Sequence, residues 1–191
     1  MSGRDEVSDM AVDLGRYTVE DLLAMPKDGR RRELVRGELF EMPPTADRYG
    51  AVVMNLGILL AGPIKGQGLG IVLADSGVVL SRHPATVLGP DVAVKLGVSS
   101  EARAQSKTYG EQLPDIVFEV VSPSDSPNAV HAKMRTYLEA GVPMAVAVWP
   151  DREEITVAAV DGRWDVLTAN ETLDLSDLVP GLRIVVSEIF D

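Results

Sequence analysis

The chain has 191 residues, of which 46% are hydrophobic and 25% are charged, and its formal net charge is −11 at pH 7. These values predict one soluble folded domain, because a chain of this length can bury a core of its own and is too hydrophobic for intrinsic disorder. The sequence contains no cysteine, which excludes disulfides, thiolate zinc sites and cysteine nucleophiles and favours a cytoplasmic location.

The start of the chain and its charge bear on targeting and partners. The first twelve residues lack the features of a signal peptide, and no stretch approaches the length of a transmembrane helix. The acidic balance counts against nonspecific binding to nucleic acid, because Lys and Arg supply most of that affinity. A basic run at Arg30, Arg31 and Arg32 softens this objection. We expect residues 1–16 to form a poorly ordered tail and residues 17–191 to form the domain.

The N-terminal third predicts a short helix, a hairpin and a longer helix. Thr18 is a suitable N-cap for a helix within residues 17–25. Residues 33–42 are typical of two short strands joined at a tight turn, and the two prolines that follow end the second strand. Apolar residues then recur at helical spacing over residues 49–60, which predicts a helix of about three turns with one buried face.

Three apolar runs follow, at residues 71–74, 77–80 and 91–96. Turn residues separate them, so we expect three consecutive strands in an antiparallel meander. The polar stretch at residues 97–112 lacks periodicity and is interpreted as a surface excursion.

The segment after it predicts a strand at residues 115–121, a helix at about residues 127–140 and a strand at residues 144–149. Ser126 and the proline after it fit the N-cap and first position of this helix. A crossover of this kind normally makes two parallel neighbours covered by the helix, so the two strands belong at the centre of a sheet.

The C-terminal part predicts more strand. Asp161-Gly162 lies between two short strand-like runs, and this pair suits the type I′ turn of a hairpin. Residues 179–190 predict a last strand with a short helical end.

Glu119 is the sharpest chemical clue in the chain. It lies in the run 115–121, whose two faces are both apolar when side chains alternate along a strand. A strand with two apolar faces is usually covered on both, and burying an ionised carboxylate there costs several kcal/mol unless it is paired or bound to a metal. Glu119 therefore needs a partner, unless it lies near the strand end where water reaches it.

Two further residues are candidates for that partnership. Asp91 follows Gly-Pro at the head of a predicted strand, although ordinary turn chemistry explains this position equally well. Lys133 shares a helix face with Val130, Met134 and Tyr137, which directs its amine toward the sheet. The alternative is a lysine that extends to solvent at the margin of that face.

Other catalytic signatures are missing from the sequence. It has no GxGxxG, P-loop, HExxH, GxSxG or EF-hand pattern, and neither His83 nor His131 is placed as a ligand or a base.

Four segments, taken in order, resemble one bacterial family: residues 33–39, 89–92, 114–125 and 133–142. It is the Uma-two family of restriction-endonuclease-like proteins, and the resemblance runs from about residue 17 to residue 190. The resemblance implies a mixed α/β fold, a central mixed sheet flanked by helices with an additional C-terminal β-hairpin. It also implies membership of the PD-(D/E)XK nuclease superfamily.

The resemblance also implies a site. Asp91 matches the motif Asp and Glu119 its (D/E), which makes both expected ligands of Mg²⁺, with Mn²⁺ as a substitute. The usual Lys position holds Val121 instead, and Lys133 matches the lysine that replaces it from the following helix. Glu33 matches a recurrent acidic position, where it either supports the metal or pairs with one of the three arginines.

The implied activity is metal-dependent hydrolysis of phosphodiester bonds in nucleic acid, with DNA as the expected substrate and a homodimer expected by analogy. Tyr49 stands where many relatives carry His, and this departure and the acidic balance leave a second reading open. That alternative is a noncatalytic dimeric interaction domain with an acidic surface that meets a basic protein. A small-molecule hydrolase or phosphatase with the same metal is a third.

Overall fold

A computed structural model describes residues 16–42, 46–99, 109, 112–123 and 125–191. The predicted tail at residues 1–16 lies, apart from Arg16, outside the described residues. Most of the predicted excursion at residues 97–112 also lies outside them.

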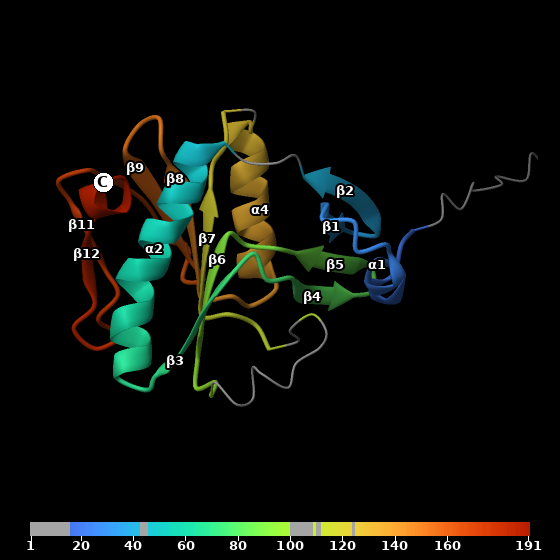
Figure 1. The fold of residues 1–191 in the computed structure, drawn as a ribbon, viewed down its shortest axis with the longest axis horizontal. Helices are drawn as coiled ribbons and strands as arrows, with labels where there is room; N and C mark the ends of the chain where they lie inside the picture. The colour runs from blue at the N-terminus through green and yellow to red at the C-terminus, as the bar shows by residue number, and fades with distance from the viewer. Residues whose placement is uncertain (1–15, 43–45, 100–108, 110–111, 124) are drawn as a thin grey trace, which may run out of the picture.

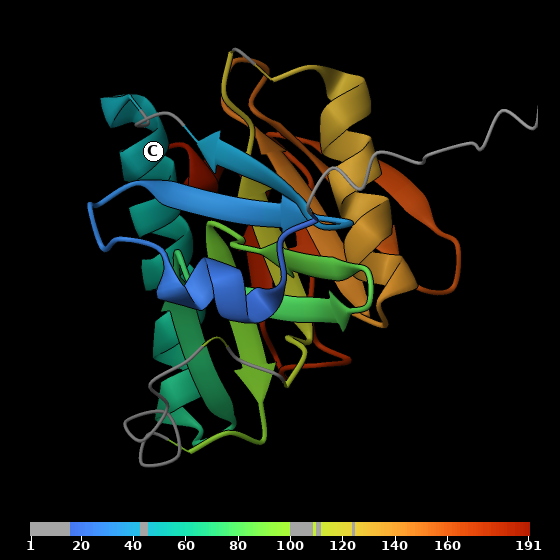
Figure 2. The same ribbon diagram turned by 90° about the vertical axis from the view of Figure 1, so that its right-hand side faces the viewer.

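A six-stranded mixed sheet forms the centre of the molecule, in the order β10-β9-β8-β7-β6-β3 (Figure 1). Its strands are β3 (Gly70–Ala74), β6 (Val92–Leu96), β7 (Ile116–Val120), β8 (Met144–Trp149), β9 (Glu154–Ala159) and β10 (Trp164–Thr168). The helices α2 (Asp47–Gly66) and α4 (Pro127–Glu139) lie on its two sides (Figure 2). The predicted central mixed sheet flanked by helices is therefore confirmed.

The β7–α4–β8 unit forms as the sequence predicts. β7 and β8 pair in parallel at the centre of the sheet, whereas the other pairs in this sheet are antiparallel. The Ser126 hydroxyl accepts a hydrogen bond from the Ala129 amide at 3.2 Å, and Pro127 is the first residue of α4. Capping and a fixed proline φ thus start the helix where the chain leaves the sheet.

A second sheet has the order β2-β1-β5-β4 and carries the short helix α1 (Val19–Ala24). Its strands are β1 (Arg31–Val35), β2 (Glu38–Met42), β4 (Val78–Arg82) and β5 (Ala85–Leu88). The predicted hairpin of β1 and β2 and the Thr18 N-cap of α1 are confirmed.

The predicted antiparallel meander is wrong. β3 pairs with β6, whereas β4 pairs with β5 in the second sheet, and β5 was not predicted. The chain leaves the six-stranded sheet after β3 and returns to it before β6, and the Asp75 amide donates to the Asp91 carbonyl at 3.2 Å between these two crossings. Alternation of apolar residues identifies a strand but not its partner, and the partners here are distant in sequence.

The C-terminal part adds β11 (Thr172–Asp174), β12 (Arg183–Val185) and the 3₁₀-helix η1 (Val186–Ile189). The β9–β10 hairpin, the last strand and the helical end match the prediction, and β11 was not predicted.

Helix α2 is longer than the predicted residues 49–60. Among the described residues it is one helix whose length and hydropathy would allow it to cross a membrane, contrary to the expectation from the sequence. Its Val52, Leu56 and Leu60 are buried against the six-stranded sheet, as in the core helix of a folded domain.

Candidate active site

The four predicted site residues come together on the α4 side of the six-stranded sheet. Glu119 lies on β7, Lys133 on α4 and Glu33 on β1, and Asp91 directly precedes β6. Val117 and Val121 pack against α4 on this side of the sheet, whereas Phe118 packs against α2 on the other side. The alternation of β7 therefore sends Glu119 toward α4, as the sequence predicts.

Lys133 joins two of the carboxylates. Its Nζ donates to Glu33 Oε1 at 2.9 Å and to Glu119 Oε2 at 3.0 Å, and its side chain is only 20% exposed. Burial lowers the pKa of Lys133, but the charges of Glu119 and Glu33 more than offset this and raise it above its ordinary value. The alternative of a lysine that extends to solvent is wrong.

Glu119 is buried and held at both oxygens. The Tyr137 hydroxyl donates to Oε1 at 2.6 Å, and Lys133 donates to Oε2. Burial raises the pKa of Glu119 to about 7; Lys133 opposes the shift, and Asp91 and Glu33 add to it. A carboxyl with this pKa changes its charge near neutral pH.

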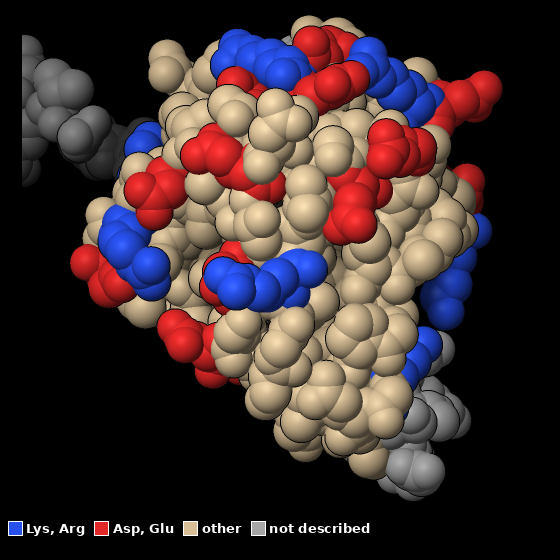
Figure 3. All heavy atoms as spheres, turned by 90° about the vertical axis from the view of Figure 1, so that its left-hand side faces the viewer, with Lys and Arg blue, Asp and Glu red and all other residues tan. Residues whose placement is uncertain are grey.

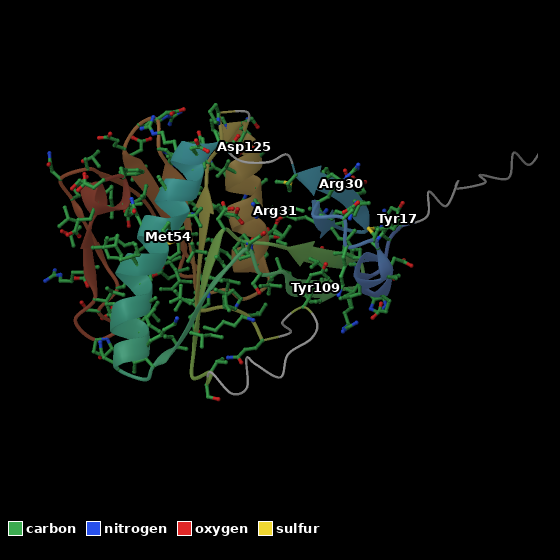
Figure 4. The ribbon with its side chains drawn as sticks, in the orientation of Figure 1. Tyr17, Arg30, Arg31, Met54, Tyr109 and Asp125 are labelled. Carbon is green, nitrogen blue, oxygen red and sulfur yellow. The ribbon has the colours of Figure 1, made fainter. Side chains whose placement is uncertain are left out.

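Asp91 is anchored to the strand that carries Glu119. The Val120 amide donates to Asp91 Oδ2 at 2.8 Å, and the Arg31 guanidinium donates to Oδ1 at 3.2 Å. Arg31 also contacts Asp75 Oδ1 at 2.7 Å and donates to the Gly89 carbonyl at 3.1 Å. Figure 4 shows Arg31 near the boundary between the two sheets. The acidic pair thus lies together at the junction of the two sheets.

Glu33 does not pair with the arginine run, so that alternative for Glu33 is wrong. Its Oε1 accepts from Lys133 and from the Gly89 amide at 2.8 Å. Alternation along β1 points Glu33 and Arg31 to the same side, where each meets a different partner. Glu33 serves to hold the Lys133 amine in place.

The arginine run is not an open basic patch. Arg30 and Arg32 both contact Asp28 and Glu41, away from the site. On the face of the molecule that carries β11 and β12, blue and red side chains are mixed and a broad area is uncharged (Figure 3). Because neither the arginine run nor this face forms an open basic surface, the acidic net charge still counts against nonspecific binding to nucleic acid.

Two residues of the site were missed in the sequence, Arg31 and Tyr137. Both had a signal: Arg31 lies two residues before Glu33 on one strand, and Tyr137 lies four residues after Lys133 on one helix face. Tyr49, in contrast, packs in the core on the α2 side, and its buried hydroxyl has no hydrogen-bond partner within the described part of the chain.

The site contains more carboxylates than positively charged side chains. Four carboxylates, those of Glu33, Asp75, Asp91 and Glu119, surround the two cations Arg31 and Lys133. The carboxylate oxygens fit Mg²⁺, a hard cation that takes oxygen ligands and balances surplus negative charge. The described residues contain no ready-made cluster of three acidic or histidine ligands. Arg31 and Lys133 already contact Asp91 Oδ1 and Glu119 Oε2, so a metal would have to displace a cation from these oxygens.

Comparison with known proteins identifies the relatives of the chain. No curated protein matches it. A solved structure of "a putative nuclease belonging to DUF820" from Anabaena variabilis superposes with a TM-score of 0.76 over 91% of this chain and 97% of that one, at 16% sequence identity. Residues 19–187 match the family Uma2, described as "Putative restriction endonuclease". The chain therefore belongs to the Uma2 family.

Proposed function

We propose that this protein is a metal-dependent nuclease that hydrolyses phosphodiester bonds in nucleic acid, with DNA as its substrate. The observation that carries the proposal is the surplus of carboxylates around the buried Glu119, at the junction of two sheets. The family description, "Putative restriction endonuclease", and the description of the matching structure, which names "a putative nuclease", support the same class of activity.

Asp91 and Glu119 would hold Mg²⁺, with Mn²⁺ as a substitute. The bound metal supplies polarisation of the scissile phosphate and a lowered pKa of a coordinated water. The Val120 amide holds Asp91 Oδ2 in place. The other oxygen, Oδ1, accepts from Arg31 and would exchange this partner for the metal.

Lys133 would stabilise negative charge on the phosphate or orient the attacking water. Glu33 also holds the Lys133 amine, and would keep it in the site if the metal replaced it at Glu119. Tyr137 is a positioning residue, because its hydroxyl fixes the Glu119 carboxylate from the buried side.

Arg31 would take a second role once it leaves Asp91. Its side chain is partly exposed and also contacts Asp75 at the edge of the site. A guanidinium there could bind a phosphate of the nucleic-acid backbone through two parallel hydrogen bonds.

The test is calorimetric titration with Mg²⁺ and Mn²⁺, followed by incubation with single- and double-stranded DNA and RNA. Asp91→Asn should abolish metal binding and cleavage, and Lys133→Met should abolish cleavage. The matched control is Asp174→Asn, since Asp174 also pairs with an arginine, Arg183, at 2.8 Å but lies on β11. Cleavage that survives Asp91→Asn and Lys133→Met would overturn the proposal.

One observation favours the noncatalytic alternative. Each oxygen of Asp91 and Glu119 already accepts a hydrogen bond from a protein donor. A domain that uses these residues only as a buried ion-pair network would bind no Mg²⁺ at millimolar concentration and cut none of the four substrates. That result would favour an interaction domain.

A further inference from the structure

The outer face of α2 is apolar, although it points away from the core. Met54 is 64% exposed and Ile58 is 65% exposed. The exposed stripe continues at helical spacing through Asp47, Ala51, Gly62 and Lys65. The sequence has no charged residue between Arg48 and Lys65. Figure 4 shows Met54 on this helix.

The candidate active site does not account for this face. Glu119 and Lys133 lie on the α4 side of the six-stranded sheet, and α2 covers the opposite side. The inner side of α2 already packs in the core through residues such as Leu56 and Leu60. Met54 and Ile58, one helical turn apart, together form a small apolar patch on its outer side.

The charges at the two ends of the stripe are opposite. Asp47 lies in the first turn of α2 and Lys65 in the last. If a second copy of α2 lies antiparallel across the first, with Leu56 at the level of the twofold axis, each Asp47 lies opposite a Lys65. In the same register each Met54 lies opposite an Ile58, and each Ala51 opposite an Ala61. The face is thus complementary to itself in both charge and hydrophobicity.

We propose that the outer face of α2 is the interface with a second copy of this chain, formed by antiparallel packing of the two helices. The small residues Ala51, Ala61 and Gly62 allow the axes to approach to about 8 Å, the close end of the usual range. Antiparallel packing also brings the positive end of each helix dipole to the negative end of the other. An isologous contact of this kind closes at two copies.

The available area sets the strength of the dimer. A helix of 20 residues is about 30 Å long. One helix pair buries less than the roughly 800 Å² per partner of a standard stable interface. An interface below the standard size is typical of weak association, so we expect the dimer to form at micromolar rather than nanomolar concentration.

The proposed dimer keeps the two candidate active sites apart. Because each α2 lies on the far side of its sheet from Glu119, the two sites face away from each other. A dimer through α2 leaves both sites open and does not bring them to the two strands of one duplex. The inference does not depend on nuclease activity, and its tests do not measure cleavage.

The test is sedimentation velocity on the full chain at loading concentrations from about 1 µM to 1 mM, a range that brackets the strength expected for an interface of this size. Wild type should shift from monomer to dimer, and Ile58→Glu should raise the dissociation constant at least about a hundredfold, because two carboxylates would be buried per dimer. The matched control is Val166→Glu, since Val166 is 56% exposed but lies on β10. A wild type that stays monomeric overturns the proposal, and so does a dimer lost only in Val166→Glu.

A charge exchange tests the register. Asp47→Lys should weaken the dimer about tenfold by placing two lysines opposite each other, and the double variant Asp47→Lys/Lys65→Glu should restore it. Circular dichroism confirms that each variant is folded. Failure of the double variant to recover overturns the antiparallel register.

A lipid surface is the other candidate occupant of an apolar helix face. Wild type should not co-sediment with vesicles of phosphatidylcholine and phosphatidylglycerol. Co-sedimentation that Ile58→Glu removes, without dimerisation in solution, would overturn the proposal in favour of a membrane.

Discussion

The two faces of β7 meet opposite surroundings. Ile116, Phe118 and Val120 face α2 and enter a hydrophobic layer that contains, among the described residues, no buried charged side chain, whereas Val117, Glu119 and Val121 face α4 around a network of buried charges. The α2 face stabilises the fold through apolar burial. The α4 face contributes less, because each buried charge must be compensated by a partner. One face of β7 thus serves mainly the stability of the fold, and the other face carries the candidate active site.

The largest effect should come from the apolar face. Phe118 is fully buried, and Phe118→Ala leaves a cavity that should lower the free energy of unfolding by about 3–5 kcal/mol. Urea unfolding measures it, with the exposed Val160→Ala as the control, which should change stability little. Equal losses in the two variants would contradict the packing seen around β7.

Lys133→Met should lower the free energy of unfolding by less than Phe118→Ala does, and the loss should depend on pH. It leaves Glu33 and Glu119 without their shared cation, which should lower stability by about 3 kcal/mol at pH 8, the low end for a buried pair because the Lys133 side chain is 20% exposed. At pH 6 the loss should be smaller, because Glu119 can take up a proton and become neutral. Urea titrations at both pH values measure the difference. A loss that is independent of pH would mean that Glu119 does not respond to Lys133.

The third effect is the pH dependence of the wild type. The folded protein raises the pKa of Glu119 from its ordinary 4.5 to about 7, so between these values the folded state binds more protons than the unfolded chain. Stability from this group is therefore full below about pH 4.5, falls by at most about 1.4 kcal/mol per pH unit up to pH 7, and is constant above it. The free energy of unfolding of Glu119→Gln should not fall with pH in this way. An unchanged pH dependence in the variant would mean that another group causes it.

The smallest effect should come from Tyr137→Phe. It removes one hydrogen bond to Glu119 and should cost about 1 kcal/mol. That hydrogen bond lowers the pKa of Glu119, so its loss should shift the stability slope to higher pH. A matched control is Tyr17→Phe at the exposed N-terminal side of α1 (Figure 4). If stability falls over the same pH range in Tyr137→Phe as in the wild type, Tyr137 is not a positioning residue.

The elements could be predicted where a local rule applies. The alternation of β7, the helical stripe of α4 and the Ser126 cap are properties of neighbouring residues, and the structure has them as predicted. The meeting of Glu119 with Lys133 followed from the same rules, because a strand and the helix after it form one crossover unit. The metal roles of Asp91 and Glu119 stay predictions.

The sequence by itself determined which side chains face inward, since periodicity and capping depend on residues a few positions apart. Only the tertiary structure decided that β3 and β4 belong to different sheets, that Glu33 pairs with Lys133, and that Arg31 pairs with Asp91. These pairings join residues 60 to 100 positions apart. The physical reason is that many partners of suitable charge or shape satisfy the same local pattern, and only the packing of the whole chain selects one.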